Sequence, residues 1–211
     1  MKCSILKENL YNGLVVVSSI TSKNLTLPIL QNVRISATQG AIEFATTNLE
    51  IGIRHTMRGK VDEVGDITVP ARVFLEIVNT LPNERVDCST DGNTLTIQCA
   101  QLKTILRGIS AEEFPVIPTL SDGIEVVVES KECADALGQV LFSAATDEAR
   151  PEIHGVFLKA EEKKLLFAST DSFRLSEREI STTTNIAEAQ TRIIPQRTLH
   201  ELERLIAQNP D

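Results

Sequence analysis

An internal repeat constrains the fold of this chain more than any other feature of its 211 residues. The stretch 32–48, NVRISATQGAIEFATTN, matches the stretch 155–171, GVFLKAEEKKLLFASTD, without a gap and at an offset of 123 positions. A second pair of stretches, 68–81 and 193–206, matches in the same order at an offset of 125 positions. Two ordered matches at nearly one offset indicate a duplicated domain, and so long a period is typical of tandem domains rather than of a solenoid.

The alternation of apolar and polar residues predicts the same elements in both copies, namely a strand, a helix and three strands, in two cycles. The fold class is therefore α+β. A linker, EEFPVIPTLSDG, separates a first domain at 1–122 from a second domain at 123–211. The second copy lacks counterparts of TLTIQCA and LKTILRGI, so we expect the chain to be part of a longer protein. The expected helices span 7–20, 71–81, 131–143 and 196–207, and the stretch 124–130 is expected to be a strand.

Composition and charge exclude several classes of protein. The formal charge of -8 argues against a uniformly basic nucleic-acid binder, although a protein of this charge can still gather its cations on one face. The N-terminal stretch MKCSILKENLYNG is not a signal peptide, and the apolar runs are too short to span a membrane. The four cysteines show no CxxC spacing and are expected to be buried thiols of a reduced, cytoplasmic protein without a metal or other cofactor.

Catalytic motifs are missing from the sequence. It contains no GxGxxG, no GKS or GKT loop and no GxSxG, and its histidines, His55, His154 and His200, have no metal-ligand spacing. One acid–base group can be drawn in the stretch TDEARPEIHG, from Asp147, Glu148, Glu152 and His154. A solvated loop is the favoured interpretation of that stretch, because no second constellation supports catalysis.

The run FASTDSFRL, 167–175, also has the appearance of an active site. Its Ser169, Thr170 and Asp171 align with Thr46, Thr47 and Asn48 of the first copy, so the repeat predicts a strand-to-strand corner closed by polar side chains. The copies differ after the corner, where the second has Ser172–Leu175. Two interpretations stay open there: the apolar residues alternate into the core, or they line a surface groove for a partner's apolar side chains.

The sequence resembles the bacterial beta sliding clamp family, the processivity subunit of DNA polymerase III. Motifs that carry the resemblance occur in order along the whole chain: TLPIL, TTNLEIGI, TVPARVFLEIVNTLP, EEFP, ATDEARPEIHGV, FASTDSFRL and IIPQRTLHEL. The resemblance implies a DNA clamp fold of three similar domains per subunit, of which this chain holds the first and part of the second. It also implies a homodimeric ring in the full-length form, with helices lining a channel for double-stranded DNA and sheets outside.

The resemblance further implies a non-catalytic function and three groups of site residues. The implied partners of the protein are the DNA polymerase III catalytic subunit, the clamp loader and other clamp-binding-motif proteins. No association with a membrane is implied. The DNA-facing residues would be Lys23, Asn24, Arg72, Arg150, Arg197 and Arg204. The partner-peptide groove would comprise Ile153, Thr170, Ser172, Phe173, Arg174 and Leu175, and the dimer interface Ile77, Lys103 and Leu106.

The match departs from the family pattern at two places. Pro151 and Glu152 stand where some members have a pair of tyrosines. Ser172 stands where a glycine is common, and Phe173 stands where a polar residue is common. The leading hypothesis is a DNA sliding clamp. The alternatives are a clamp-fold protein-binding scaffold that does not encircle DNA and, last, an enzyme that uses the 147–154 loop.

Overall fold

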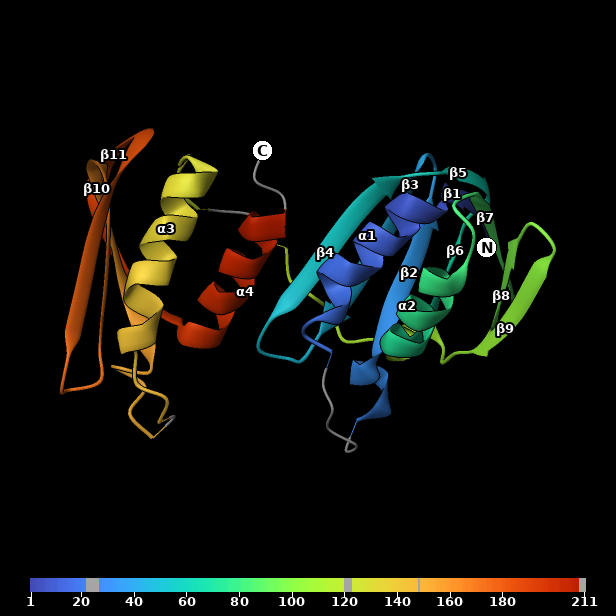
Figure 1. Ribbon diagram of the computed structural model, residues 1–211, viewed down its shortest axis with the longest axis horizontal. Helices are drawn as coiled ribbons and strands as arrows, with labels where there is room; N and C mark the ends of the chain where they lie inside the picture. The colour runs from blue at the N-terminus through green and yellow to red at the C-terminus, as the bar shows by residue number, and fades with distance from the viewer. Residues whose placement is uncertain (22–26, 120–122, 148, 209–211) are drawn as a thin grey trace. The chain divides into compact units, whose positions relative to one another are not determined.

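The computed structural model describes residues 1–21, 27–119, 123–147 and 149–208. These fall into two compact units, Met1–Pro118 and Thr119–Asp211, each with its own helices and strands (Figure 1). The expected linker residues 120–122 lie outside the described residues.

The first unit builds two antiparallel sheets, of strand order β4-β3-β2-β6 and β5-β1-β7-β8-β9. The expected order of a strand, a helix and three strands, repeated once, is confirmed, with one addition, β5. The elements are β1 (Lys2–Leu6), α1 (Lys7–Ser18), η1 (Pro28–Gln31), β2 (Asn32–Thr38), β3 (Ala41–Thr47), β4 (Gly52–Arg58), β5 (Lys60–Glu63), β6 (Gly65–Pro70), α2 (Ala71–Thr80), β7 (Arg85–Asp91), β8 (Thr94–Cys99), β9 (Leu102–Arg107) and η2 (Ala111–Glu113).

The strand β5 was not expected because its four residues, KVDE, carry little apolar pattern and are mostly exposed. It pairs with β1 at the edge of the five-stranded sheet. Such a short, charged edge strand discourages pairing with other chains and leaves a weak sequence signal.

Helices α1 and α2 lie side by side in the first unit (Figure 1). Each buries one stripe of apolar residues, and the rings of Phe44 in β3 and Phe74 in α2 meet edge to face, with their centroids 6.4 Å apart. Gly13, which weakens the sequence signal for α1, packs closely on β4: an added Cβ would displace the end of the Met57 side chain and stand 3.1 Å from the His55 ring. The glycine therefore serves close helix–sheet packing at a cost in helix propensity.

The second unit consists of α3 (Ser130–Val140), η3 (Leu141–Ser143), β10 (Gly155–Thr170), β11 (Leu175–Pro195) and α4 (Gln196–Gln208). Strand β10 covers the residues that match β2 and β3, with Glu162 at a φ of 53° between them, and β11 covers the residues that match β4 and β6. Its core joins the sheet to buried residues of α3 and to Leu199 of α4.

Strand registers reproduce the sequence repeat. In the first unit Thr47 faces Gly52 and Ala41 faces Arg58; in the second Thr170 faces Leu175 and Lys164 faces Ser181, each 123 positions on. The outer ends agree as well, because Asn32 faces Pro70 as Gly155 faces Pro195. The duplication predicted from the sequence is thus a duplication of backbone pairing.

The expected strand at 124–130 is wrong. The described residues 123–129 form no strand, although Val127 accepts hydrogen bonds from Thr182 and Thr183 and donates one to Thr184. The matching strand of the first unit, β1, lies between β5 and β7. Residues 182–184 belong to β11, but within the described part of the second unit no strand flanks 123–129 on the other side, and the bonds of Val127 alone do not make a ladder.

One buried hydroxyl in each unit ties the sheet to a helix. Thr46 Oγ1 donates to the carbonyl of Val17 at the end of α1 (2.6 Å), and Ser169 Oγ donates to the carbonyl of Val140 at the end of α3 (2.5 Å). Both pairs keep the offset of 123, and both hydroxyl-bearing residues are buried. A buried hydroxyl of this kind saves a helix-terminal carbonyl from being left without a partner.

We therefore predict that Thr46→Val and Ser169→Ala each lower the free energy of unfolding of the unit concerned by about 1–2 kcal/mol, because each leaves a buried carbonyl unsatisfied. Thr38→Val is the control, since the Thr38 hydroxyl bonds a carbonyl in an exposed position and its loss should cost less than about 0.5 kcal/mol. Urea unfolding followed by circular dichroism measures both, and equal effects of Thr46→Val and Thr38→Val would contradict the prediction.

Candidate functional site

The corner between β10 and β11 is closed by its own polar side chains. Thr170 Oγ1 donates to the carbonyl of Arg174 (2.7 Å) and accepts from the N–H of Ser172 (3.1 Å). Asp171 Oδ1 accepts from the N–H groups of Phe173 and Arg174, both at 3.0 Å. These are the Asx and Thr turn bonds that the repeat predicts.

The first unit has the same corner. Thr47 Oγ1 donates to the carbonyl of Ile51 and accepts from the N–H of Leu49, both at 3.0 Å, and Asn48 Oδ1 accepts from the N–H of Ile51 (2.8 Å). Leu49 and its counterpart Ser172 both have a left-handed φ, 77° and 78°. The polar run is therefore a scaffold feature, and the interpretation as a corner is confirmed.

The apolar residues after the second corner lie on the surface. Phe173 is 96% exposed and Leu175 is 70% exposed, so the interpretation that they alternate into the core is wrong. Phe142 of η3 is 56% exposed and lies next to Arg174. The Arg174 guanidinium is 5.4 Å from the centroid of the Phe142 ring. Phe142 thus lies next to a cation of the corner, and the residues on either side of that cation, Phe173 and Leu175, are exposed. Exposed apolar side chains of this kind are typical of a peptide-binding site.

Sequence reasoning missed Phe142. Its neighbours in the chain, Leu141 and Ser143, are buried, and Phe142 faces the other way from the 3-10 turn η3. The sequence did contain a signal for its exposure. The buried residues of α3 follow a helical spacing, and Phe142 falls off that buried stripe when the spacing is extended beyond the helix. The stripe comprises Cys133, Ala136, Leu137 and Val140.

The loop 147–154 borders the same surface. Arg150 donates from Nη1 to Ser172 Oγ (3.4 Å) and pairs with Asp147 (Nε to Oδ2, 3.5 Å). Ile153 is half-buried, and its carbonyl accepts from the N–H of Ala145. His154 Nδ1 lies 3.0 Å from the carbonyl of Ala145. These bonds are those of an ordered loop, while Glu148 lies outside the described residues.

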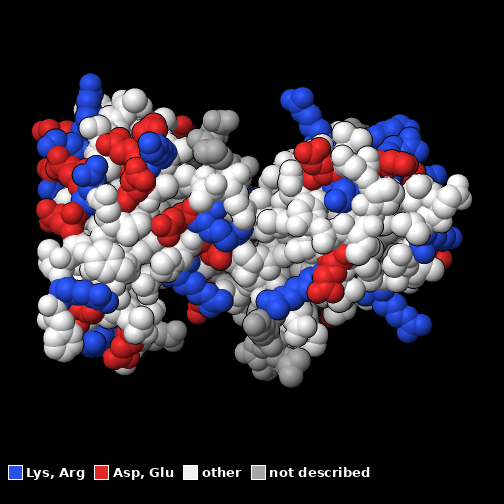
Figure 2. Space-filling model, viewed as in Figure 1, with Lys and Arg blue, Asp and Glu red and all other residues white. Residues whose placement is uncertain are grey.

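The six expected DNA-facing residues have different surroundings. Arg72 in α2 is exposed, with no ion pair to any described residue, and Arg197 in α4 is exposed. Arg204 is held within α4 by Glu201 (Nε to Oε2, 2.9 Å). Lys23 and Asn24 lie outside the described residues. In the face that Figure 2 shows, side chains of both signs are interspersed.

The expected dimer-interface residues differ in their exposure to solvent. Lys103 in the edge strand β9 is exposed and Ile77 in α2 is half-buried, whereas Leu106 is only 8% exposed. The exposed apolar side chains of β9 are those of Leu102 and Ile105, at 51% and 59%.

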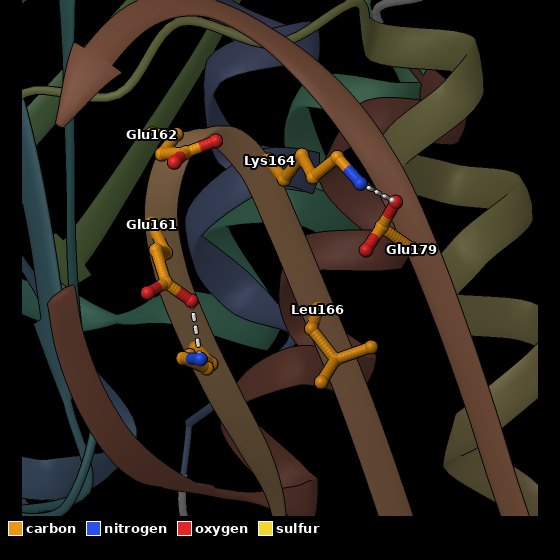
Figure 3. Close-up of a pocket in the computed structure, with 6 residues that line it drawn as sticks. Glu161, Glu162, Lys164, Leu166 and Glu179 are labelled. Atoms are coloured by element: carbon orange, nitrogen blue, oxygen red, sulfur yellow. Dashed lines mark ion pairs between the residues drawn. The ribbon is translucent and has the colours of Figure 1, made fainter.

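A hollow of about 320 Å³ lies in the second unit beside Glu162, where Figure 3 shows the ribbon of β10 turning back on itself. Lys164 pairs there with Glu179 at 2.8 Å, and Lys159 pairs with Glu161. Because these cations and carboxylates neutralise one another on an exposed tip, the hollow has the character of a solvated surface.

The electrostatics of the second corner centre on Asp171. The N–H groups of Phe173 and Arg174, and then the Arg174 guanidinium, hold the pKa of this carboxyl below its usual 3.8. In the first unit the matching Asn48 accepts the same bonds but offers an Nδ2 that has no partner in the described part of the chain. The charge on the second corner therefore serves to fix Arg174.

Two kinds of feature are absent from the described residues. No helix among them is long and apolar enough to cross a membrane. No group of three or more His, Cys, Asp or Glu side chains in the described ranges is placed to hold a metal ion. The four cysteines are free and buried.

Two α+β units that repeat the same strand pairing and the same polar corner, each with two α-helices, are the architecture of a clamp-fold protein. Family models agree: residues 1–118 match the "DNA polymerase III beta subunit, N-terminal domain" and residues 127–211 match the "central domain" of the same subunit. The chain belongs to the beta sliding clamp family, whose members are non-catalytic subunits, so an acid–base function of the 147–154 loop is set aside.

Individual relatives support the assignment. The chain is 27% identical to the beta sliding clamp of Bacillus subtilis (strain 168), over 100% of this chain and 58% of that protein. It is 32% identical to the clamp of Synechococcus elongatus, over 98% and 56%. The crystal structure of the B. subtilis clamp superposes with a TM-score of 0.93 at 27% identity, covering 97% of this chain and 56% of that one. The chain thus spans less than two thirds of the length of these relatives.

We predict that Asp171 titrates below its usual pKa of 3.8 and that Arg174→Ala raises its pKa only part of the way back, because the backbone N–H groups are its main partners. Since the folded-state pKa is lowered, the contribution of Asp171 to stability is complete above 3.8 and is lost as the pH falls through the lower, folded value. Carboxyl ¹³C NMR measures the titration, and a pKa at or above 3.8 would contradict it.

Proposed function

We propose that this chain is the first domain and part of the second domain of a DNA sliding clamp, which as a full-length homodimer encircles duplex DNA and tethers the replicative polymerase. The observation that carries the proposal is the difference between two otherwise equivalent corners. Both keep the same bonds and a left-handed residue at the same place. The first corner exposes one large apolar side chain, Leu49, whereas the second exposes Phe173 and Leu175 and has the exposed Phe142 next to its Arg174.

A scaffold corner with exposed apolar side chains fits a short linear peptide. Phe142, Leu175 and the half-buried Ile153 offer apolar surface, while Arg174 and Thr170 offer polar groups at its border. The apolar side chains of a partner would supply most of the affinity, and the polar border its orientation. The proposed partners are the polymerase III catalytic subunit, the clamp loader and other proteins with a clamp-binding motif, in the cytoplasm.

The proposed DNA contact suits the acidic composition of the chain. A ring holds DNA by topology and needs weak phosphate contacts that permit sliding, so a few cations on the helices are sufficient. Arg72 and Arg197 occupy matching positions in the two repeats, on the first turns of α2 and α4. They are the proposed lining cations. Arg150, Arg204, Lys23 and Asn24 are proposed to assist them, and Ile77, Lys103 and Leu106 to belong to the dimer interface.

For the groove we predict that Leu175→Ala and Phe142→Ala each weaken binding of a clamp-binding-motif peptide from a polymerase III catalytic subunit by about tenfold or more, since each removes a large contact side chain. The peptide is labelled with fluorescein, and anisotropy measures its affinity for the 211-residue chain. Leu49→Ala is the matched control, because Leu49 is 61% exposed in the other corner. Equal losses with Leu49→Ala, or none with Leu175→Ala, would contradict the groove.

For the DNA contact we predict that the double variant Arg72→Glu/Arg197→Glu weakens binding to a duplex oligonucleotide. The slope of log K against log salt should fall by about 2, since each phosphate contact contributes about 0.9. Lys164→Glu/Lys163→Glu is the control with the same change of charge at the exposed tip of β10. Unchanged DNA binding combined with intact peptide binding would favour the alternative, a clamp-fold scaffold that does not encircle DNA.

A further inference from the structure

Two thiols of the first unit face each other across neighbouring strands. Cys3 of β1 stands directly opposite Cys88 of β7 in the antiparallel ladder. Directly opposed residues present their side chains on the same face of a sheet, and here both residues are buried, with exposures of 1% and 3%. Both are free cysteines, far apart in the sequence, and neither the family resemblance nor the proposed groove gives the pair a role.

The strand register sets the distance between the two backbones. The N–H of Thr90 bonds the carbonyl of Met1. Hydrogen-bonded pairs alternate with non-bonded pairs along an antiparallel ladder, so Cys3 and Cys88, two positions further on, form a hydrogen-bonded pair whose Cα atoms stand about 5.5 Å apart. A disulfide bridges Cα atoms about 4.4–6.8 Å apart. The backbone therefore has the spacing that a disulfide requires.

The two sulfurs interact in the reduced protein. The Cys88 thiol donates a hydrogen bond to the Cys3 sulfur, and this bond lowers the pKa of Cys3 below its usual 9.0. The same hydrogen bond, together with burial, raises the pKa of Cys88 well above 9.0. Cys3 is therefore the sulfur of the pair that ionises first, which makes it the one to attack an oxidant.

The other two cysteines are placed less well for a bond. Cys99 of β8 shares the buried face but stands opposite Val86, so it lies diagonally from Cys88. Diagonal neighbours stand about 7–8 Å apart, and a disulfide does not span that distance unless the backbone moves. Cys133 belongs to α3 of the second unit. Of the four cysteines, only Cys3 and Cys88 are directly opposed.

The strand that carries Cys3 lies next to a weak edge, as Figure 1 shows for β1 and β5. The strand β5 has only four residues, and its register against β1 shifts between Lys2 and Cys3. A hollow of about 360 Å³ lies against β1 and β7 and includes Cys3 and Cys88 in its lining, so solvent stands close to the backbone of both. Local opening of this short edge admits a small oxidant to the sulfurs.

We propose that Cys3 and Cys88 form a reversible, redox-sensitive bond that links β1 to β7 in the presence of oxidants of the peroxide class. The Cys3 thiolate attacks one oxygen of hydrogen peroxide, the O–O bond breaks, and a sulfenic acid forms on Cys3 with release of hydroxide. Cys88 then attacks the Cys3 sulfur: the S–S bond forms, the S–O bond breaks, and the hydroxyl leaves as water with the Cys88 proton. The hydroxide takes up the proton that Cys3 released, so two thiols and one peroxide give one disulfide and two waters. A dithiol reductant reverses the change.

The bond acts on the five-stranded sheet of the first unit. It joins neighbouring strands of the order β5-β1-β7-β8-β9 and closes a long loop of the chain, which stabilises the unit by restricting its unfolded state. The same sheet carries β9, with the proposed interface residues Lys103 and Leu106. Oxidation therefore fixes the sheet that presents the proposed dimer interface, whether or not the proposed groove binds a peptide.

The test treats the folded 211-residue chain with hydrogen peroxide, blocks the remaining thiols with iodoacetamide in denaturant, and measures the intact mass. Two thiols should be lost together with the mass of two hydrogens, and dithiothreitol should restore both. Circular dichroism should show the thermal midpoint of the first unit raised by at least about 5 °C. Cys3→Ala and Cys88→Ala should each abolish the mass change and the shift, whereas Cys99→Ala, the matched control, should retain both.

Peptide mapping locates the bond. In the folded Cys99→Ala chain, trypsin should release Cys3 and Cys88 in one cross-linked pair of peptides, in at least about tenfold excess over any other pairing. In urea, where the register is lost, the same oxidant should instead join Cys88 to Cys99 of the unaltered chain, because these two are nearest in sequence. Thiols that persist in peroxide, a bond to Cys99 or Cys133 in the folded chain, sulfinic acid without a bond, or an unchanged preference for Cys3 with Cys88 in urea would each overturn the proposal.

Discussion

Hydrogen bonds from short polar side chains to the backbone, made at the same place in each repeat, are the constraint on which both units depend. Thr46 and Ser169 bond the last turns of α1 and α3, and the next residues, Thr47 and Thr170, close the corners. Two consecutive residues in each unit thereby fix a helix end and a strand end to each other. The sheet registers, which agree pair for pair between the units, follow from that fixed starting point.

The sequence predicted those features that leave a periodic or repeated signal. The duplication, the helices and the corner were all accessible, because a turn closed by its own side chains is local chemistry. The strand β5 and the state of 124–130 were not accessible, because each depends on neighbouring strands. The strand β5 gains its place from β1, whereas 124–130 meets β11 at Val127 and has no second flanking strand among the described residues. Phe142 was missed because its exposure is decided where α3 passes into η3.

Charge and apolar exposure vary independently of the scaffold. Matching positions carry Leu49 and Ser172, or Asn48 and Asp171, in the same backbone conformation. The proposed groove uses such freedom at a repeated corner, where the backbone is kept and the side chains that it presents are changed.

The left-handed φ of Ser172 has a consequence for the kinetics of the proposed groove. A residue other than glycine in that conformation stores backbone strain, which persists here because three side-chain bonds hold the residues around it. The loop is consequently rigid before any partner arrives. Binding of a peptide therefore requires little further ordering of this loop. The entropic cost of association should come almost entirely from the ordering of the peptide.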